Sequence, residues 1–114
     1  SGKGVAASLL MANLHALFRT LVTAGTPFEE LAPRVNRLFA DSTLSSSYAT
    51  AVLMTLGADG EVRICNAGHC PPLVVHGGTI DAIGATGMAL GMFHDVEFAC
   101  ERRQLAPGDA VLLY

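Results

Sequence analysis

Two short segments carry residue types that could take part in chemistry. The first, Ser1-Gly2-Lys3-Gly4, leads directly into a helical pattern. Backbone amides at the positive end of a helix can face a phosphate or a carboxylate. The segment is not a Walker loop, because glycine follows Lys3 where that motif has serine or threonine. Taken alone, these four residues fit a plain glycine-rich start of a helix better than an anion site.

The second segment, Asn66-Ala67-Gly68-His69-Cys70-Pro71-Pro72, ends a predicted strand and turns the chain. Gly68 allows a backbone conformation that is closed to other residues, and the two prolines end strand pairing. His69 is therefore placed at a strand end, where side chains often line clefts. A structural hydrogen-bonding role is the more common one for a single histidine at a turn, so both roles stay open.

The other candidate metal ligands are scattered along the chain. Asp109 stands in a Pro107-Gly108-Asp109 turn and is predicted to be a turn residue rather than a metal ligand. Cys65, Cys70 and Cys100 form no CxxC arrangement, so a zinc site is not indicated. Three thiols cannot all pair within one chain. Free thiols in an apolar chain favour a reducing, cytoplasmic setting.

Composition indicates one compact domain with a well-filled core. The chain has 114 residues, of which 51% are hydrophobic and 15% are charged. A net charge of -3 gives no reason to expect nucleic acid or an anionic membrane as a partner. No uninterrupted apolar run approaches the ~20 residues that a membrane span requires. The most apolar stretch, residues 5–16, is predicted to be a buried helix.

Two helices are predicted in the first part of the chain. Apolar residues at spacings of three and four indicate a helix over residues 5–24, and Gly25 is well placed to end it. A second helix begins at Thr26-Pro27, where threonine suits the N-cap and proline the first turn. Pro33 can shorten or split the beginning of that helix. The buried positions expected in the two helices are Leu14, Leu17, Leu21, Leu31, Val35, Leu38 and Phe39.

The spacing of the apolar residues changes from a helical to an extended pattern after a serine-rich loop predicted at residues 41–47. Residues 57–60 and Gly77-Gly78 are turn signals between strands. The first helix is expected to pack on the sheet that contains Val52 and Ile64. Helices followed by hairpin-linked strands predict an α+β domain with an antiparallel sheet. The predicted strands are residues 48–56, 61–67, 73–75, 79–83, 96–100 and 110–113.

Six segments, in order and with suitable spacing, resemble one known family. They are SGKGVAASLLMA, AGTPFEELAPRVNRLF, YATAVLMTL, CNAGHCPPLVV, GMALGM and LAPGDAVLLY. Together they resemble the stage II sporulation protein E family, the bacterial branch of the type-2C protein phosphatases, which includes the sigma-factor regulatory serine phosphatases. Each motif is modest, but the resemblance runs through the whole chain.

The resemblance implies an antiparallel β-sandwich of two sheets flanked by helices. It also implies paired Mn²⁺ or Mg²⁺ ions that activate a water to attack phosphoserine or phosphothreonine, without a covalent enzyme intermediate. The family's metal-binding aspartates lie shortly before the SGKG segment and after the LLY segment, outside these residues. Residues 1–114 are therefore expected to be a single phosphatase-like domain truncated at both ends, which lacks the main metal ligands and is inactive alone.

The resemblance also implies where residues of this chain lie relative to the active site. Ser1, Gly2, Lys3 and Gly4 would form a turn beside the active site. His69 stands where the broader type-2C family carries an aspartate that helps to bind an additional metal, and imidazole is an acceptable manganese ligand. His69 is therefore a candidate metal neighbour. The implied partners are a phosphorylated anti-sigma-factor antagonist, as substrate, and a sensory domain in the same protein.

The leading hypothesis is thus a metal-dependent protein-serine/threonine phosphatase, and two other functions compete with it. A catalytically inactive, phosphatase-like domain would act only as a binding or regulatory module, and aspartates on both flanks would argue against it. A nucleotide-binding domain would use the SGKG turn, but it requires a strand and a longer glycine-rich motif upstream. Nothing after Lys3 supports that third function.

Overall fold

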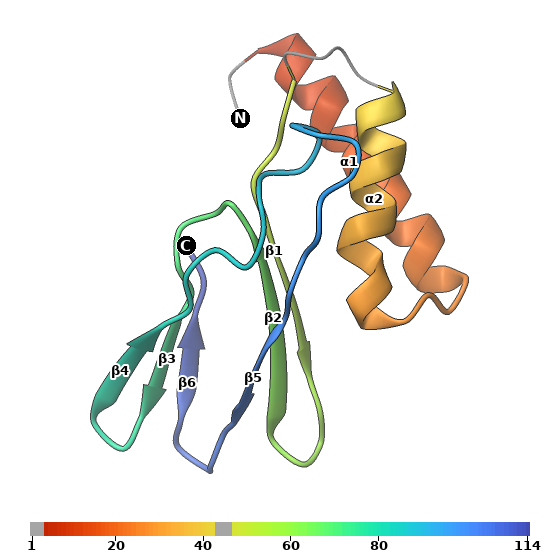
Figure 1. Ribbon diagram of the computed structural model, residues 1–114. Helices are drawn as coiled ribbons and strands as arrows, with labels where there is room; N and C mark the ends of the chain where they lie inside the picture. Colours follow the sequence, from red (N-terminus) through yellow and green to blue (C-terminus); the bar gives the residue numbers. More distant parts are fainter. Residues whose placement is uncertain (1–3, 43–46) are drawn as a thin grey trace.

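The computed structural model describes residues 4–42 and 47–114. Two helices, α1 (Val5–Thr23) and α2 (Phe28–Ser42), form a hairpin at the start of the chain, and six strands follow them (Figure 1). The strands are β1 (Ala51–Leu56), β2 (Glu61–Ala67), β3 (Leu73–His76), β4 (Thr79–Ala82), β5 (Glu101–Gln104) and β6 (Ala110–Leu112).

Local sequence signals set the ends of the helices. Gly25 has a φ of +80°, a left-handed conformation that glycine adopts without strain, and it follows α1 as predicted. The N–H of Thr26 then donates to the carbonyl of Leu21, which satisfies one of the last carbonyl groups of the helix. α2 begins at Phe28, and Pro33 lies inside it without splitting it.

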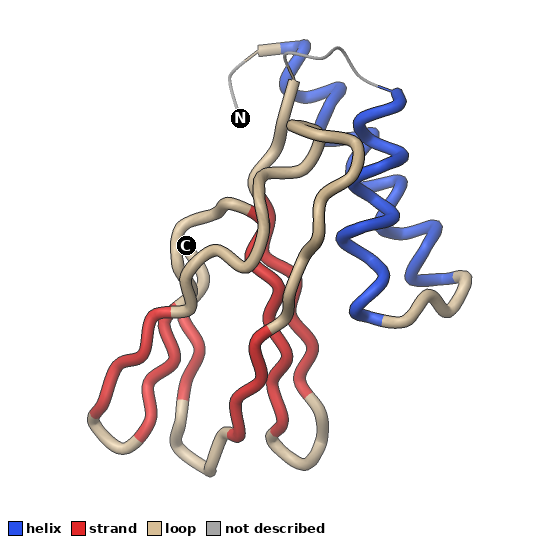
Figure 2. Tube along the Cα trace, viewed as in Figure 1, coloured by secondary structure: helices blue, strands red, loops and turns tan. Residues whose placement is uncertain are grey.

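The strands form two antiparallel sheets of three strands each (Figure 2). The first sheet has the order β1-β2-β5, and the second has the order β4-β3-β6. β1 and β2 are a hairpin in which Ala51 pairs with Ala67 and Leu56 with Val62, joined by the predicted turn at residues 57–60. The long connection from β4 to β5 carries the chain from the second sheet back to the first (Figure 1).

Alternation of side chains along β2 divides the core into two parts. Cys65 faces the helices and packs with Leu53 and Phe28. Ile64, its neighbour, faces the second sheet and packs with Val74. The order of layers is therefore helices, first sheet, second sheet, as the ribbon also shows (Figure 1). The predicted α+β class, an antiparallel sandwich with flanking helices, is confirmed.

The first helix buries less of its apolar stripe than predicted. Leu14 is buried as expected, with 4% of its surface exposed, but Leu17 and Leu21 are only partly buried. The helix packs on the sheet that contains Val52 and Ile64, as expected, because its cluster includes Ala67 of β2. The side chains of Val52 and Ile64 themselves face the second sheet. Successive strand residues point to opposite faces of the sheet, so the side chains next to Val52 and Ile64 in the sequence face the helices.

The second helix buries a polar residue that the apolar pattern did not predict. Leu31, Val35 and Phe39 are buried as expected. Leu38 is 44% exposed, so its predicted burial is wrong, and Asn36 is buried instead. The helix also extends to Ser42, into the predicted loop at residues 41–47, whose residues 43–46 lie outside the described part of the chain.

The strand predicted at residues 96–100 is wrong, because the ladder with β2 begins only at Glu101, opposite Ile64. Another segment occupies the edge of β2 beyond that point. The N–H groups of Thr86 and Gly87 both donate to the carbonyl of Asn66, at 2.9 and 3.2 Å. Ala99 then donates to the carbonyl of Thr86 instead of pairing with β2. At the other edge of the sheet, β1 begins at Ala51 rather than at residue 48.

Among the described residues, one helix, α1, is long and apolar enough to cross a membrane by length and composition alone. The sequence had predicted no such segment, because polar residues interrupt its apolar runs. In this structure α1 packs on the core by one stripe, with Leu14 buried in a cluster that also contains Val35 of α2. Several large apolar residues elsewhere on α1 are exposed, namely Val5, Leu9, Met11 and Val22.

Candidate functional site

The SGKG turn lies mostly outside the described part of the chain, which begins at Gly4. Gly4 has a φ of +92° and immediately precedes α1. Its carbonyl accepts hydrogen bonds from the N–H and the hydroxyl of Ser8, both at 3.1 Å. A left-handed conformation at this position explains why the sequence has glycine there. The role of Ser1, Gly2, Lys3 and Gly4 beside an active site stays a prediction.

The turn after β2 is built around the side chain of Asn66, which is fully buried. Its Oδ1 accepts the N–H of His69 at 2.8 Å, and its Nδ2 donates to the carbonyls of His69 and Ile83 at 3.1 and 3.2 Å. Gly68 has a φ of +67° and lies against Ala89. The turn is therefore fixed at both ends by one asparagine, and it places His69 directly after the strand, as predicted.

Both ring nitrogens of His69 are engaged. Nδ1 lies 2.8 Å from the hydroxyl of Thr50, and Nε2 lies 2.8 Å from the backbone carbonyl of Tyr114. A carbonyl oxygen can only accept a hydrogen bond, so Nε2 carries the hydrogen and donates it. The role of His69 as a metal neighbour stays a prediction, and a metal would have to displace one of these two partners.

A cleft of about 500 Å³ lies beside His69, between α1, the start of β1 and the residues after β6. Met11 and His15 line it from α1, and His69 and Tyr114 line it from the sheet ends. The cleft thus brings the second of the two predicted chemical segments next to the first helix. The two ring partners of His69 were not predicted, because nothing in the sequence shows which strand ends become neighbours.

The described residues do not fit a complete metal site. They contain no group of three or more His, Cys, Asp or Glu side chains that could hold a metal ion together. Cys65 and Cys100 are no candidates for a nucleophile either, because burial raises the pKa of Cys65 to about 11 and also raises the pKa of Cys100. All three cysteines are free thiols.

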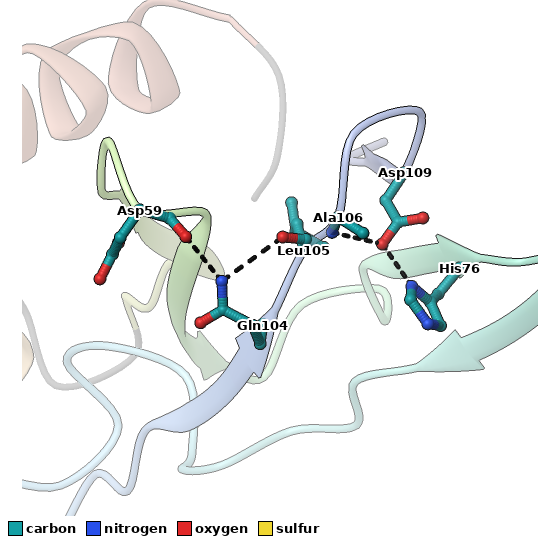
Figure 3. A network of polar contacts seen from close by, with 6 residues as sticks. All are labelled: Asp59, His76, Gln104, Leu105, Ala106 and Asp109. Atoms are coloured by element: carbon teal, nitrogen blue, oxygen red, sulfur yellow. Dashed lines mark hydrogen bonds and ion pairs between the residues drawn. The ribbon is translucent and has the colours of Figure 1, made fainter.

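Asp109 takes the structural role that was predicted for it (Figure 3). Its Oδ2 accepts the N–H of Ala106 at 2.8 Å and also contacts Nδ1 of His76. These hydrogen bonds, first that of Ala106 and then that of His76, hold the pKa of Asp109 below its usual value. Close by, the amide of Gln104 donates to the carbonyl of Asp59 at 2.6 Å. This network joins turns at the end of the strands opposite to the one where β2 ends (Figure 1).

Comparison with known proteins adds an independent finding. The family model described as Stage II sporulation protein E (SpoIIE) matches residues 1–114. The phosphoserine phosphatase RsbP of Bacillus subtilis (strain 168) is 30% identical over 119 residues, which cover 99% of this chain and 30% of that protein.

One solved structure supports the fold described above, and a second match is weaker. A crystal structure of the RsbU and RsbW domains of a Mycobacterium tuberculosis protein matches with a TM-score of 0.80 and 32% identity. The match covers 97% of this chain and 32% of that one. The phosphatase domain of the cell fate determinant SpoIIE from Bacillus subtilis matches with a TM-score of 0.45 and 19% identity, over 97% of this chain and 48% of that one. The chain thus spans about a third of the length of the RsbP and RsbU–RsbW relatives.

Proposed function

This chain belongs to the stage II sporulation protein E family, and from that membership we propose that its protein hydrolyses phosphoserine or phosphothreonine on a regulatory protein. The observation that carries the proposal is the similarity to RsbP, a phosphoserine phosphatase, which extends over 99% of this chain. The similarity to the RsbU–RsbW structure, at 32% identity and a TM-score of 0.80, supports it.

The proposed substrate is a phosphorylated anti-sigma-factor antagonist, and the proposed setting is the cytoplasm. A solved relative combines an RsbU domain with an RsbW domain, which supports a regulatory protein as the partner. A sensory domain elsewhere in the same protein would control the activity. The relatives are about three times as long as this chain, which leaves room for such a domain in proteins of this kind.

The proposed reaction depends on Mn²⁺ or Mg²⁺, which supply an activated water when bound. The described residues do not form the metal site, so carboxylates outside them would hold the ions. The contribution of this chain is then the scaffold: the middle of α1, the start of β1, His69 and the residues after β6 shape the cleft beside which the chemistry would take place.

The test is hydrolysis by the protein that includes the residues on both flanks of this chain. Peptides carrying phosphoserine, phosphothreonine or phosphotyrosine are offered with Mn²⁺, with Mg²⁺ or with a chelator. The proposal expects turnover of the first two peptides, only with metal. Binding of a phosphorylated antagonist without turnover would overturn it in favour of an inactive binding module. The 114-residue chain alone is expected to be inactive, and turnover equal to that of the longer protein would show that metal ligands lie within it.

Two variants of the longer protein test the predicted place of the SGKG turn. A side chain at Gly2 is expected to strain a turn that passes close to the metals, so Gly2→Val should abolish metal-dependent turnover while the fold is retained. Lys3→Ala is the matched control, since a solvated side chain at a helix start should affect activity only modestly. Full activity of Gly2→Val would remove this turn from the active site.

A further inference from the structure

The ring of His69 joins the ends of three strands that belong to both sheets. His69 follows β2, its Nδ1 meets the hydroxyl of Thr50 just before β1, and its Nε2 donates to the carbonyl of Tyr114 just after β6. We infer that His69 is a positioning residue, which latches the two sheets together at the cleft end of the sandwich and does not bind a metal.

Both ring nitrogens of His69 are used in hydrogen bonds between strand ends. Nε2 donates its hydrogen to a carbonyl at 2.8 Å, so this nitrogen has no lone pair to offer a metal. Nδ1 faces the Thr50 hydroxyl at 2.8 Å, which is a full hydrogen bond. Metal binding at either nitrogen would therefore remove a bond between strand ends.

The backbone of His69 is itself held in place by a buried side chain. Asn66 is fully buried and bonds both the N–H and the carbonyl of His69. The same asparagine bonds the carbonyl of Ile83, in the connection that leaves the second sheet. A buried side chain with all of these partners fixes the position of His69, and the two ring bonds then fix the positions of the neighbouring strand ends.

The latch acts on the cleft described above. Tyr114 and His69 line one side of it, and Met11 and His15 line the other. The inference rests on the proposed function in one respect: in a metal-dependent phosphatase, the latch would hold the wall of this cleft in the geometry that turnover needs. The hydrogen bonds themselves do not depend on that function.

Two substitutions of His69 separate a positioning role from a role as metal ligand. His69→Gln keeps an N–H donor near the position of Nε2 but has no nitrogen lone pair for a metal, whereas His69→Ala keeps neither. Thr50→Val removes only the hydroxyl partner of Nδ1 and nearly preserves the shape of the side chain. Cys70→Ala, at the exposed next position of the same turn, is the matched control.

The experiment uses the longer protein and two readouts. Hydrogen–deuterium exchange of the segments around Thr50 and Tyr114 is measured without metal, and the Mn²⁺ concentration for half-maximal hydrolysis of a phosphoserine peptide is measured in parallel. His69→Ala should speed exchange in both segments. It should also raise the Mn²⁺ concentration for half-maximal hydrolysis about tenfold or more, the usual effect of removing a group that positions a metal site from outside it. His69→Gln should restore both to within about threefold of the parent protein.

Two outcomes would overturn the latch. In the first, the Mn²⁺ concentration for half-maximal hydrolysis rises as much in His69→Gln as in His69→Ala, while exchange is unchanged in both variants. That result would make His69 a metal ligand. The second is unchanged exchange around Tyr114 in His69→Ala. If the parent protein hydrolyses none of the peptides, the proposed function fails, and the exchange readout still decides whether the latch exists.

Discussion

The side chain of Asn36 and the main chain of Gly91, 55 positions apart in the sequence, are joined by a buried hydrogen bond of 2.8 Å. The Gly91 N–H donates to Oδ1 of Asn36, and Nδ2 of Asn36 donates to the carbonyls of Phe93 and His94 at 2.8 and 3.1 Å. One side chain of α2 thus fastens the connection that returns the chain from the second sheet to the first.

Replacement of Asn36 by alanine should therefore be strongly destabilising. Asn36 is 1% exposed, and its removal leaves an N–H and two carbonyls without their partner. An unsatisfied buried group costs ~1–3 kcal/mol, so a loss above about 2 kcal/mol in the free energy of unfolding is expected. Denaturant unfolding measures it. Arg37→Ala, at the exposed neighbouring position, should change stability by less than about 0.5 kcal/mol. Equal effects of the two substitutions would contradict the role of Asn36.

Leu14 and Leu17 of the α1 stripe should differ in their contribution to stability. Leu14 is 4% exposed, so Leu14→Ala is expected to cost ~2–5 kcal/mol, the range for a buried leucine. Leu17→Ala should cost less, because Leu17 is only partly buried. Leu9→Ala, at a position that is 66% exposed, serves as the control in the same unfolding assay. A larger loss for Leu17 than for Leu14 would show that another surface covers Leu17.

The elements whose signals are local could be predicted from the sequence. β2 begins and ends where the alternation and the flanking glycines place it, and α1 ends at Thr23 beside the predicted stop at Gly25. Burial of Asn36 and the displacement of residues 96–100 from β2 depend on contacts between distant segments. No local pattern reports such contacts, so tertiary structure overrode the propensity of the chain at both places.

The candidate site, too, could be predicted only where its sequence signals are local. The position of His69 at a strand end follows from Gly68 and the two prolines, and the sequence predicted it. The bond from Asn66 to the N–H of His69 also has a local signal, because asparagine often bonds a backbone group a few residues onward. The partners of the ring, Thr50 and Tyr114, come from other strands. Their approach to His69 depends on the arrangement of both sheets.

The acid stability of the domain should depend on Asp109. Its hydrogen bonds in the folded chain hold its pKa below the ordinary value of 3.8. A carboxyl group with a depressed folded pKa contributes stability that is fully present above the unfolded pKa and is lost as the pH falls through the folded pKa. The difference in unfolding free energy between the parent chain and Asp109→Asn should therefore be largest near neutral pH and shrink below about pH 3.8. Parallel stability curves over that range would contradict the prediction.

A methyl group at Gly68 should be more costly than one at Gly77, although both glycines have a positive φ, of +67° and +55°. Alanine in the left-handed region costs ~1–2 kcal/mol by itself, which is all that Gly77→Ala should lose, since its Cβ would meet nothing within 4 Å. At Gly68 the Cβ would lie 2.9 Å from the main-chain nitrogen of Ala89.

That contact is with backbone, which cannot rotate away as a side chain could. Gly68→Ala should therefore lose about 1–3 kcal/mol more than Gly77→Ala, the range for added volume at a packed position. The displaced turn should also weaken the bond between Asn66 and the N–H of His69, which amide hydrogen exchange at His69 would report. Equal losses for the two variants, with protection at His69 unchanged, would show that the turn has room to adjust and that Gly68 is required for its φ alone.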